Sequence, residues 1–231
     1  MVTIEQLTIA DAPESWAALG FVVDGDRCRI GAVELHLAGR EAGRGLVGWT
    51  LRGLPRDGDA TPAFAGRASV APAPALDGLP TTRAETSSGE TIDPPAPAPP
   101  HPNGITRIDH VVAVAPNLDR TVTALQAAGL DLRRIREQPT PAGAPRQAFF
   151  RLGAEILEAI QEPAEVSARA GGRDRPAFFW GIALRSDDLD ATVARLGANV
   201  SEIRDAVQPG RRIASLRREA GLALPVALMT G

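Results

Sequence analysis

The stretch ITRIDHVVAVAPNLDRTVTALQAAG, residues 105–129, decides the fold. Its first half alternates in side-chain character as a β-strand does, which places Ile108 and His110 on one face. Asn117 is a good helix N-cap, and apolar residues then follow at helical spacing until Gly129 ends the helix. Three further strands are predicted, at residues 132–138, 146–152 and 154–161. The unit is therefore one strand, one helix and three strands.

The same unit recurs 71 positions later (189 minus 118). The helix positions Leu118, Val122 and Leu125 are repeated as Leu189, Val193 and Leu196. Strands are predicted around this second helix at residues 178–186, 200–206, 212–218 and 222–229. Residues 3–37 contain a shorter copy, with strands predicted at both ends and a helix from Pro13. Because an internal repeat governs the fold, we expect an α+β protein of tandem βαβββ modules.

Composition divides the chain into three parts. The predicted parts are an abbreviated N-terminal module at 1–55, a loosely ordered Pro/Ala-rich segment and linker at 56–104, and a two-module domain at 105–231, with modules at 105–161 and 176–231. The middle part contains ten of the 20 prolines, so we expect that it forms no core. Its run at 94–102 predicts an extended spacer in which His101 is exposed to solvent.

Charge and residue usage narrow the function classes. The net charge of -3 and the pI of about 5.7 give no support to a nucleic-acid or anionic-membrane partner. Cys28 is the single cysteine, which excludes an internal disulfide and a cysteine-based zinc site. All 25 basic residues are arginine, which excludes chemistry that needs a lysine amine and is typical of a GC-rich bacterial genome. Without an export leader pattern or an apolar run of about 20 residues, we expect a cytoplasmic protein.

The repeated unit resembles the modules of the vicinal oxygen chelate superfamily, which includes glyoxalase I, extradiol dioxygenases, methylmalonyl-CoA epimerase and bleomycin-resistance proteins. Three stretches carry the resemblance: IDHVVAVAPNLD at 108–119, FRLGAEILE at 150–158 and IALRSDDLDAT at 182–192. Residues 1–55 resemble a degraded module of the same kind. The resemblance implies a cupped mixed sheet around a cleft, a small-molecule ligand and a homodimer as one option.

The resemblance also places His110 at the family's first-strand metal position and Glu158 at its last-strand position. Glu158 shares a predicted strand face with Ile156 and Ile160, and an unpaired carboxylate on an apolar face is costly. One divalent metal ion (Zn, Ni, Mn or Fe) is one partner for this pair. A direct hydrogen bond between the two side chains is the alternative, and such a pair can also transfer a proton.

The second module lacks the matching ligands. The repeat offset carries His110 to Gly181, which has no donor atom. The last strand has Val226 or Ala227 where the resemblance implies a carboxylate. Catalytic zinc sites normally have three protein ligands, so the two ligands that the complete modules provide, His110 and Glu158, are too few.

The N-terminal module offers two tentative additional ligands. Its alignment with the first complete module places Gln6 opposite His110 and His36 opposite Glu158. The alternation around His36 equally fits a half-exposed strand, which favours a surface histidine.

Aromatic and arginine residues extend the candidate site. The predicted substrate-binding residues are Phe150, Phe179, Trp180, Gly181 and Arg212. The aromatic residues cluster beside two central strands, where the glycine would leave room for a ligand; core packing is the alternative. In the arginine clusters at 133–136 and 211–218, each strand doublet sends one side chain to each face. Such an arginine binds a carboxylate or phosphate, or it keeps a sheet edge solvated.

Two functions fit these residues. The first is a glyoxalase-like enzyme, a lyase or isomerase that removes a proton next to a carbonyl, with or without a metal as Lewis acid. In it Glu158 is the base or a metal ligand, and His110 is a metal ligand or proton carrier. The alternative is a metal-free small-molecule binding or sequestration protein of the bleomycin-resistance type.

Overall fold

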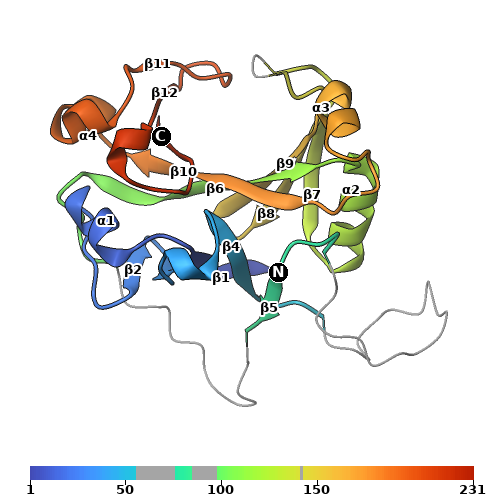
Figure 1. Cartoon of the computed structure of the whole chain (residues 1–231), viewed down its shortest axis with the longest axis horizontal. Helices are drawn as coiled ribbons and strands as arrows, with labels where there is room; N and C mark the ends of the chain where they lie inside the picture. Colours follow the sequence, from blue (N-terminus) through green and yellow to red (C-terminus); the bar gives the residue numbers. More distant parts are fainter. Residues whose placement is uncertain (56–75, 85–97, 141–142) are drawn as a thin grey trace.

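The computed structural model of the chain describes residues 1–55, 76–84, 98–140 and 143–231. Two mixed β-sheets, one of five strands and one of eight, pack against each other (Figure 1). Among the described residues, no helix has the length and apolar character needed to cross a membrane.

The N-terminal sheet is built from the first module and one later strand. Its elements are β1 (Thr3–Ile9), α1 (Pro13–Ala18), β2 (Arg27–Ile30), β3 (Val33–Leu37), β4 (Leu46–Arg52) and β5 (Thr81–Arg83). The strand order is β2-β3-β1-β4-β5. The strands alternate buried apolar and partly exposed polar residues, as expected of a sheet with one buried face.

The eight-stranded sheet contains both complete modules. Its elements are β6 (Ile105–Ala115), α2 (Leu118–Ala127), β7 (Asp131–Arg136), β8 (Gln147–Leu152), β9 (Glu155–Gln161), α3 (Ala164–Arg169), β10 (Phe178–Ser186), α4 (Leu189–Leu196), β11 (Arg204–Asp205), β12 (Arg212–Ser215) and β13 (Val226–Thr230). The order is β11-β12-β13-β10-β6-β9-β8-β7, which confirms the tandem βαβββ fold. The side chains of Asn117 and Asp188 cap α2 and α4 by accepting from the backbone N–H three residues on.

Strand pairing repeats between the two sheets. In the large sheet, β6 lies between parallel β9 and antiparallel β10, and β13 adjoins β10 in parallel. In the small sheet, β1 lies between parallel β3 and antiparallel β4, and β5 adjoins β4 in parallel. The N-terminal sheet is therefore an abbreviated copy of the centre of the large sheet, with β5 as a remnant of its last strand.

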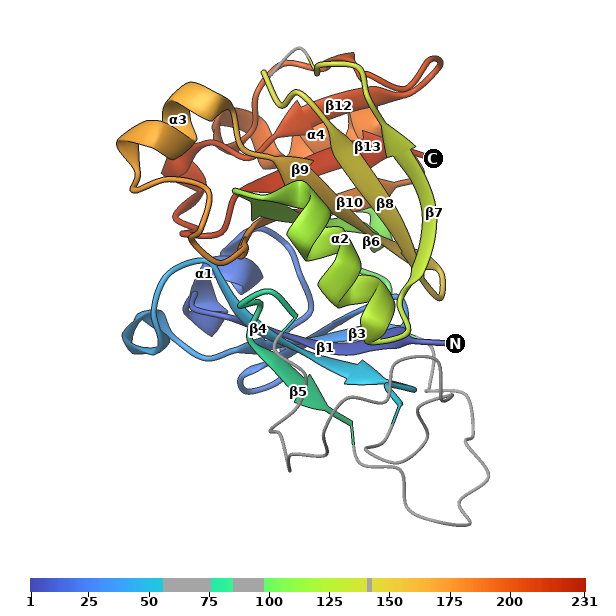
Figure 2. The same ribbon diagram turned by 90° about the vertical axis from the view of Figure 1, so that its right-hand side faces the viewer.

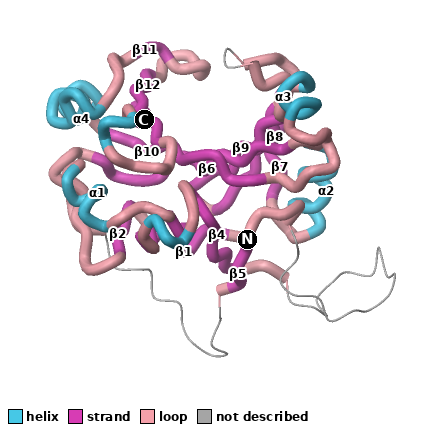
Figure 3. Tube along the Cα trace, viewed as in Figure 1, coloured by secondary structure: helices cyan, strands magenta, loops and turns pink. Residues whose placement is uncertain are grey.

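The two sheets share one core. Ala113 of β6 is fully buried, and Phe179, paired opposite it on β10, contacts Trp49 of β4 with ring centroids 5.0 Å apart. The strands occupy the centre of the molecule and the helices its periphery (Figure 3). Helix α2 lies across the strands β7–β9 (Figure 2). The opposite face of the large sheet is left to form a cavity.

Three register shifts interrupt the predicted alternation between the central strands β6 and β10. In β6 the register slips at Asp109, because Ala183 pairs with His110 and Leu184 with Ile108. Ile108 is consequently buried in the core while His110 turns to the other face, so the prediction that they share a face is wrong. In β10 the extra residue is Trp180, which is 53 % exposed. An inserted residue re-aims the side chains around it.

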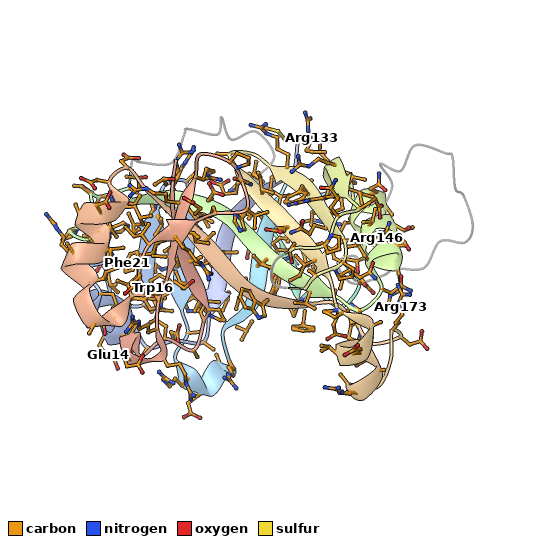
Figure 4. The ribbon with its side chains drawn as sticks, turned by 90° about the horizontal axis from the view of Figure 1, so that it is seen from above. Glu14, Trp16, Phe21, Arg133, Arg146 and Arg173 are labelled. Carbon is orange, nitrogen blue, oxygen red and sulfur yellow. The ribbon has the colours of Figure 1, made fainter. Side chains whose placement is uncertain are left out.

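Parts of the predicted linker pack against the modules. Strand β5 and the segment 98–104 belong to the described residues, whereas residues 56–75 and 85–97, which include residues 94–97 of the predicted spacer, lie outside them. His101 is buried, which corrects the prediction that it is exposed. Its Nδ1 accepts from the backbone N–H of Val22 at 3.0 Å, and its Nε2 lies 3.1 Å from the carbonyl of Arg29. Phe21 packs on its ring; Figure 4 shows Phe21 beside Trp16.

Candidate functional site

A cavity of about 460 Å³ lies on the face of the large sheet that is turned away from the N-terminal sheet. It draws on both modules, since its lining comes from β6 to β9 and from the strands and loop at β11–β13. The lining residues are His110, Arg134, Arg136, Thr140, Gln147, Phe149, Glu158, Arg204, Asp205, Ala206, Val207, Gln208, Ile213 and Met229. Its size is in the range of small-molecule sites, about 300–1,000 Å³.

Asp109, His110 and Arg211 form a hydrogen-bonded chain beside the cavity. The bulge in β6 brings the Asp109 carboxylate to 2.9 Å from His110 Nδ1. Arg211, which precedes β12, donates to the same carboxylate from both terminal nitrogens, at 2.5 and 3.4 Å. Because Nδ1 is occupied by Asp109, the other ring nitrogen of His110 is directed to the cavity.

Glu158 lies on the other side of the imidazole. Its Oε2 is 3.4 Å from His110 Nε2, and both side chains are largely buried, with 17 % and 16 % exposure. Glu158 Oε1 accepts a hydrogen bond of 2.6 Å from the side-chain amide of Gln147. The structure thus brings together the two residues that the sequence predicted as the centre of the site.

The electrostatic anchor of this chain is Asp109. Although burial acts to raise the pKa of Asp109, hydrogen bonds from His110 and Arg211 hold it well below its usual range. The carboxylate therefore stays ionised at neutral pH. An ionised Asp109 fixes the ring orientation of His110 and favours a proton on its Nδ1.

The residues at His110 do not fit the metal centre that the resemblance implies. In the described ranges, no group of three or more His, Cys, Asp or Glu side chains lies close enough to hold an ion. The strand pairing turns Ala183 and Met229 of the second module to the cavity side. His110 and Glu158 are two ligands of the histidine or carboxylate kind, whereas a catalytic zinc normally has three ligands from the protein.

The tentative ligands Gln6 and His36 lie elsewhere. Both belong to the N-terminal sheet, on β1 and β3, and neither lines the cavity. His36 Nε2 lies 3.2 Å from the carboxylate of Asp26, and its side chain is 35 % exposed. The structure does not bring these two side chains to His110.

The predicted substrate-binding residues do not line the cavity either. Phe150 is fully buried in the core, Phe179 packs on Trp49, and Trp180 projects at its bulge. No room is left beside Gly181, because a side chain there would meet the carbonyl oxygen of Pro225 at 2.5 Å. Glycine is required by that close backbone approach.

The arginine clusters separate by face, and in β7 a register shift between Leu132 and Arg134 contributes to this separation. Arg212 pairs with Asp190 of α4 on the outside, while its neighbour Arg211 turns inward to Asp109. Arg133 pairs with Asp131, and Figure 4 shows it projecting from the edge of the molecule. Arg134, the next residue, lines the cavity.

Several residues that line the cavity are absent from the set predicted from the sequence, and for one of them the sequence contained a usable pattern. Phe149 lies one residue before the predicted Phe150, and alternation sends the two to opposite faces of β8. Pairing of β8 with β9 places Phe149 opposite Glu158, so the partner strand identifies the correct phenylalanine. The contribution of Arg204 from β11 had no such local signal, because it depends on how the sheet curves.

Comparisons with known proteins agree with this fold. Residues 107–217 match the family model described as Glyoxalase/Bleomycin resistance protein/Dioxygenase superfamily. Methylmalonyl-CoA epimerase from Mycobacterium tuberculosis is similar at 21% identity and a TM-score of 0.45, over 55% of this chain and 89% of that chain. The Streptomyces coelicolor epimerase in complex with 2-nitronate-propionyl-CoA gives 24% identity, a TM-score of 0.43, and coverage of 55% and 98%.

One solved structure is similar over nearly the whole chain. A xylose isomerase-like TIM barrel/4-hydroxyphenylpyruvate dioxygenase fusion protein matches at 17% identity and a TM-score of 0.56, covering 99% of this chain and 48% of its own. At this identity the likeness concerns the fold alone. Among curated proteins, none matches this chain.

Proposed function

We propose that the chain, whose residues 107–217 match the family model described as Glyoxalase/Bleomycin resistance protein/Dioxygenase superfamily, is a small-molecule enzyme that removes a proton from a carbon next to a carbonyl group. The observation that supports this is the contact of 3.4 Å between His110 Nε2 and Glu158 at the cavity. Two proton-carrying groups side by side allow removal of a proton and its return.

In the proposed reaction Glu158 is the base. One oxygen of its carboxylate takes the proton from the substrate carbon, and the electron pair of the broken C–H bond forms the enolate. His110 gives the proton on its Nε2 to the carbon of the enolate, which forms the isomerised product. The proton held by Glu158 then passes to Nε2 across the 3.4 Å contact, which restores both groups. Gln147 holds Glu158 in place through its 2.6 Å hydrogen bond, and Asp109 orients His110.

A direct test is hydrogen exchange with solvent. 2-Oxo-4-phenylbutanoate and 4-phenyl-2-butanone, which both carry acidic hydrogens next to a carbonyl, are incubated with the protein in D₂O, and the loss of those proton signals is followed by NMR. We expect catalysed exchange of at least one probe by the wild type, and loss of catalysis in both Glu158→Gln and His110→Gln. The matched controls are Glu165→Gln on α3 and His36→Gln, whose residues lie outside the cavity. Exchange that survives both cavity substitutions rejects the proposal.

Since the donor set does not fit a metal centre, the reaction is assigned to the protein side chains. Mass spectrometry of untagged protein, with an EDTA-treated control, tests this assignment. About one Zn, Ni, Mn or Fe per chain, lost together with activity on chelation, would contradict it.

A metal-free binding or sequestration protein is the second candidate. The apolar part of the cavity lining, with Phe149, Ile213 and Met229, favours it, because such a surface holds a ligand without any reaction. Saturable ligand binding that is unchanged by EDTA, without exchange or product, distinguishes this candidate from the enzyme.

A further inference from the structure

We propose that the cavity selects an organic anion, whose carboxylate or phosphate is bound by Arg134, Arg136 and Arg204 and whose apolar body lies on Phe149. This anion site rests on the proposed function only because both concern the same cavity. It names the substrate class of that site, which the proton-transfer pair by itself leaves open.

The three arginines come from the two opposite edges of the large sheet. Arg134 and Arg136 are two residues apart on β7, so both side chains leave the same face. Arg204 lies on β11, at the far end of the strand order, yet it lines the same cavity. The sheet therefore curls until its edges face one ligand, and an anion held between them is contacted from both sides.

These guanidinium groups are not neutralised by the protein. In the part of the chain that the structure describes, Arg134, Arg136 and Arg204 form no ion pair, whereas their neighbours Arg133 and Arg212 each pair with an aspartate. A planar guanidinium donates two parallel hydrogen bonds to a carboxylate or phosphate. Three such unpaired groups around one cavity make a site for an anion.

Two acidic residues also line the cavity, and neither cancels this charge. Glu158 is held deeper by Gln147 and His110. The pKa of Arg212 is raised mainly by its hydrogen bond with Asp190 and only in small part by Asp205, which lies beside Arg204. The three arginines outnumber the two carboxylates of the cavity lining, which leaves an excess of positive charge.

Two further features describe the rest of the ligand. The guanidinium carbon of Arg134 lies over the ring of Phe149, 4.9 Å from its centroid. This contact holds the guanidinium group in place beside an apolar surface. Gln147 is 6 % exposed, and its Oε1 has no hydrogen-bond partner among the described residues. A buried acceptor without a partner is costly, and a ligand hydroxyl or N–H satisfies it.

The arrangement predicts how the substrate lies. The anionic group would be at the mouth with the arginines, and the acidic carbon near His110 and Glu158. A carboxylate adjacent to the reacting carbonyl, as in a 2-oxo acid, satisfies both positions in a molecule small enough for the cavity.

Calorimetric titration with a matched pair of probes tests the proposal. 3-Phenylpropanoate is compared with the neutral 3-phenylpropanamide, which has the same apolar body. We expect the acid to bind about tenfold more tightly than the amide, and its affinity to fall about tenfold in Arg134→Gln/Arg136→Gln and in Arg204→Gln, because each variant loses charged hydrogen bonds. Added salt should weaken the binding of the acid and leave the binding of the amide unchanged.

Arg133→Gln is the matched control, since this residue is on the same strand but faces outward. Equal binding of acid and amide, no binding of the acid, or an equal loss in the Arg133 control would each overturn the proposal. Binding is also measured in Glu165→Gln, whose residue lies on α3 outside the cavity and which should keep its affinity for the acid. If the wild type binds the acid but catalyses no hydrogen exchange, the proposed reaction is rejected and the anion site is supported. If it catalyses exchange but binds the acid independently of the arginines, the anion site is rejected and the proposed reaction is supported.

Discussion

At the scale of single residues, Asp109 changes what β6 presents to the cavity. In a regular strand its side chain would leave the face opposite to that of His110. The bulge brings both to one side, where the carboxylate lies 2.9 Å from Nδ1. One inserted residue therefore supplies the imidazole with a fixed anion that is itself held by Arg211.

Asp109→Asn tests this positioning role. The amide keeps the shape of the carboxylate but removes the charge that orients the imidazole ring of His110. We expect the exchange rate to fall about tenfold to hundredfold, as for other residues that orient a functional histidine. NMR exchange at several pH values measures it, and Asp131→Asn, whose residue pairs with the outward Arg133, is the control. An unchanged rate and pH profile would exclude the positioning role.

Cys28 offers a test of core packing. It is 1 % exposed on β2, and burial raises the pKa of its thiol to about 12. The reactive thiolate is therefore scarce at neutral pH, and reagents are excluded. We expect no labelling by iodoacetamide at pH 8 in the native protein and complete labelling of the single thiol in urea, as measured by mass spectrometry. Rapid native labelling would mean that this core opens easily.

At the scale of elements, the segment 98–104 is more than a linker. Asn103 donates to the carbonyl of Leu19 and accepts from the backbone of Ile105, at 3.0 Å each. His101 bonds the backbone on both sides of its ring, at Val22 and Arg29. These contacts attach the start of β6 to the N-terminal module.

The His101 contacts predict a pH-dependent stability. Burial lowers the pKa of His101, against a smaller rise from its hydrogen bond to the Arg29 carbonyl. The unfolded state therefore binds the proton more readily, so the contribution of His101 to stability is complete above its ordinary pKa of about 6.5 and decreases as the pH falls below it. Urea unfolding at a series of pH values should show this decrease, with a slope of up to about 1.4 kcal/mol per pH unit. His101→Gln should flatten the profile in this window, whereas His36→Gln should retain the slope.

At the scale of the whole molecule, the N-terminal sheet and the large sheet act as one folding unit. Their apolar residues form a single core cluster, which includes Trp16, Trp49, Phe150 and Leu228. Asp11, fully buried after β1, accepts from the backbone N–H groups of Ala223 and Leu224, at 2.6 and 3.4 Å. The loop after β1 is thereby hydrogen-bonded to the last loop of the chain, which precedes β13.

Asp11→Ala should destabilise the whole chain. Two buried amides lose their acceptor, which costs about 1–3 kcal/mol. Urea unfolding, followed by tryptophan fluorescence and by far-UV circular dichroism, should give coincident single transitions for the wild type, with a lower midpoint for the variant. Separate transitions would show that the two sheets unfold independently.

The homodimer stays a prediction, and sedimentation of the same sample tests it.

The amino-acid sequence alone determined the repeated module, because hydrophobic periodicity and capping are local: the strand that begins at Ile105, the Asn117 cap and the return of the unit after 71 residues are all confirmed. It also predicted His110 and Glu158 as candidate site residues, and the neighbouring strands β6 and β9 bring these two side chains together. Only the tertiary structure decided that Asp109 joins them and that His101 is buried. Edge strands far apart in the sequence placed Arg134 and Arg204 on one cavity. A bulge and the curvature of a sheet arise from contacts across strands, and no local pattern in one strand records them.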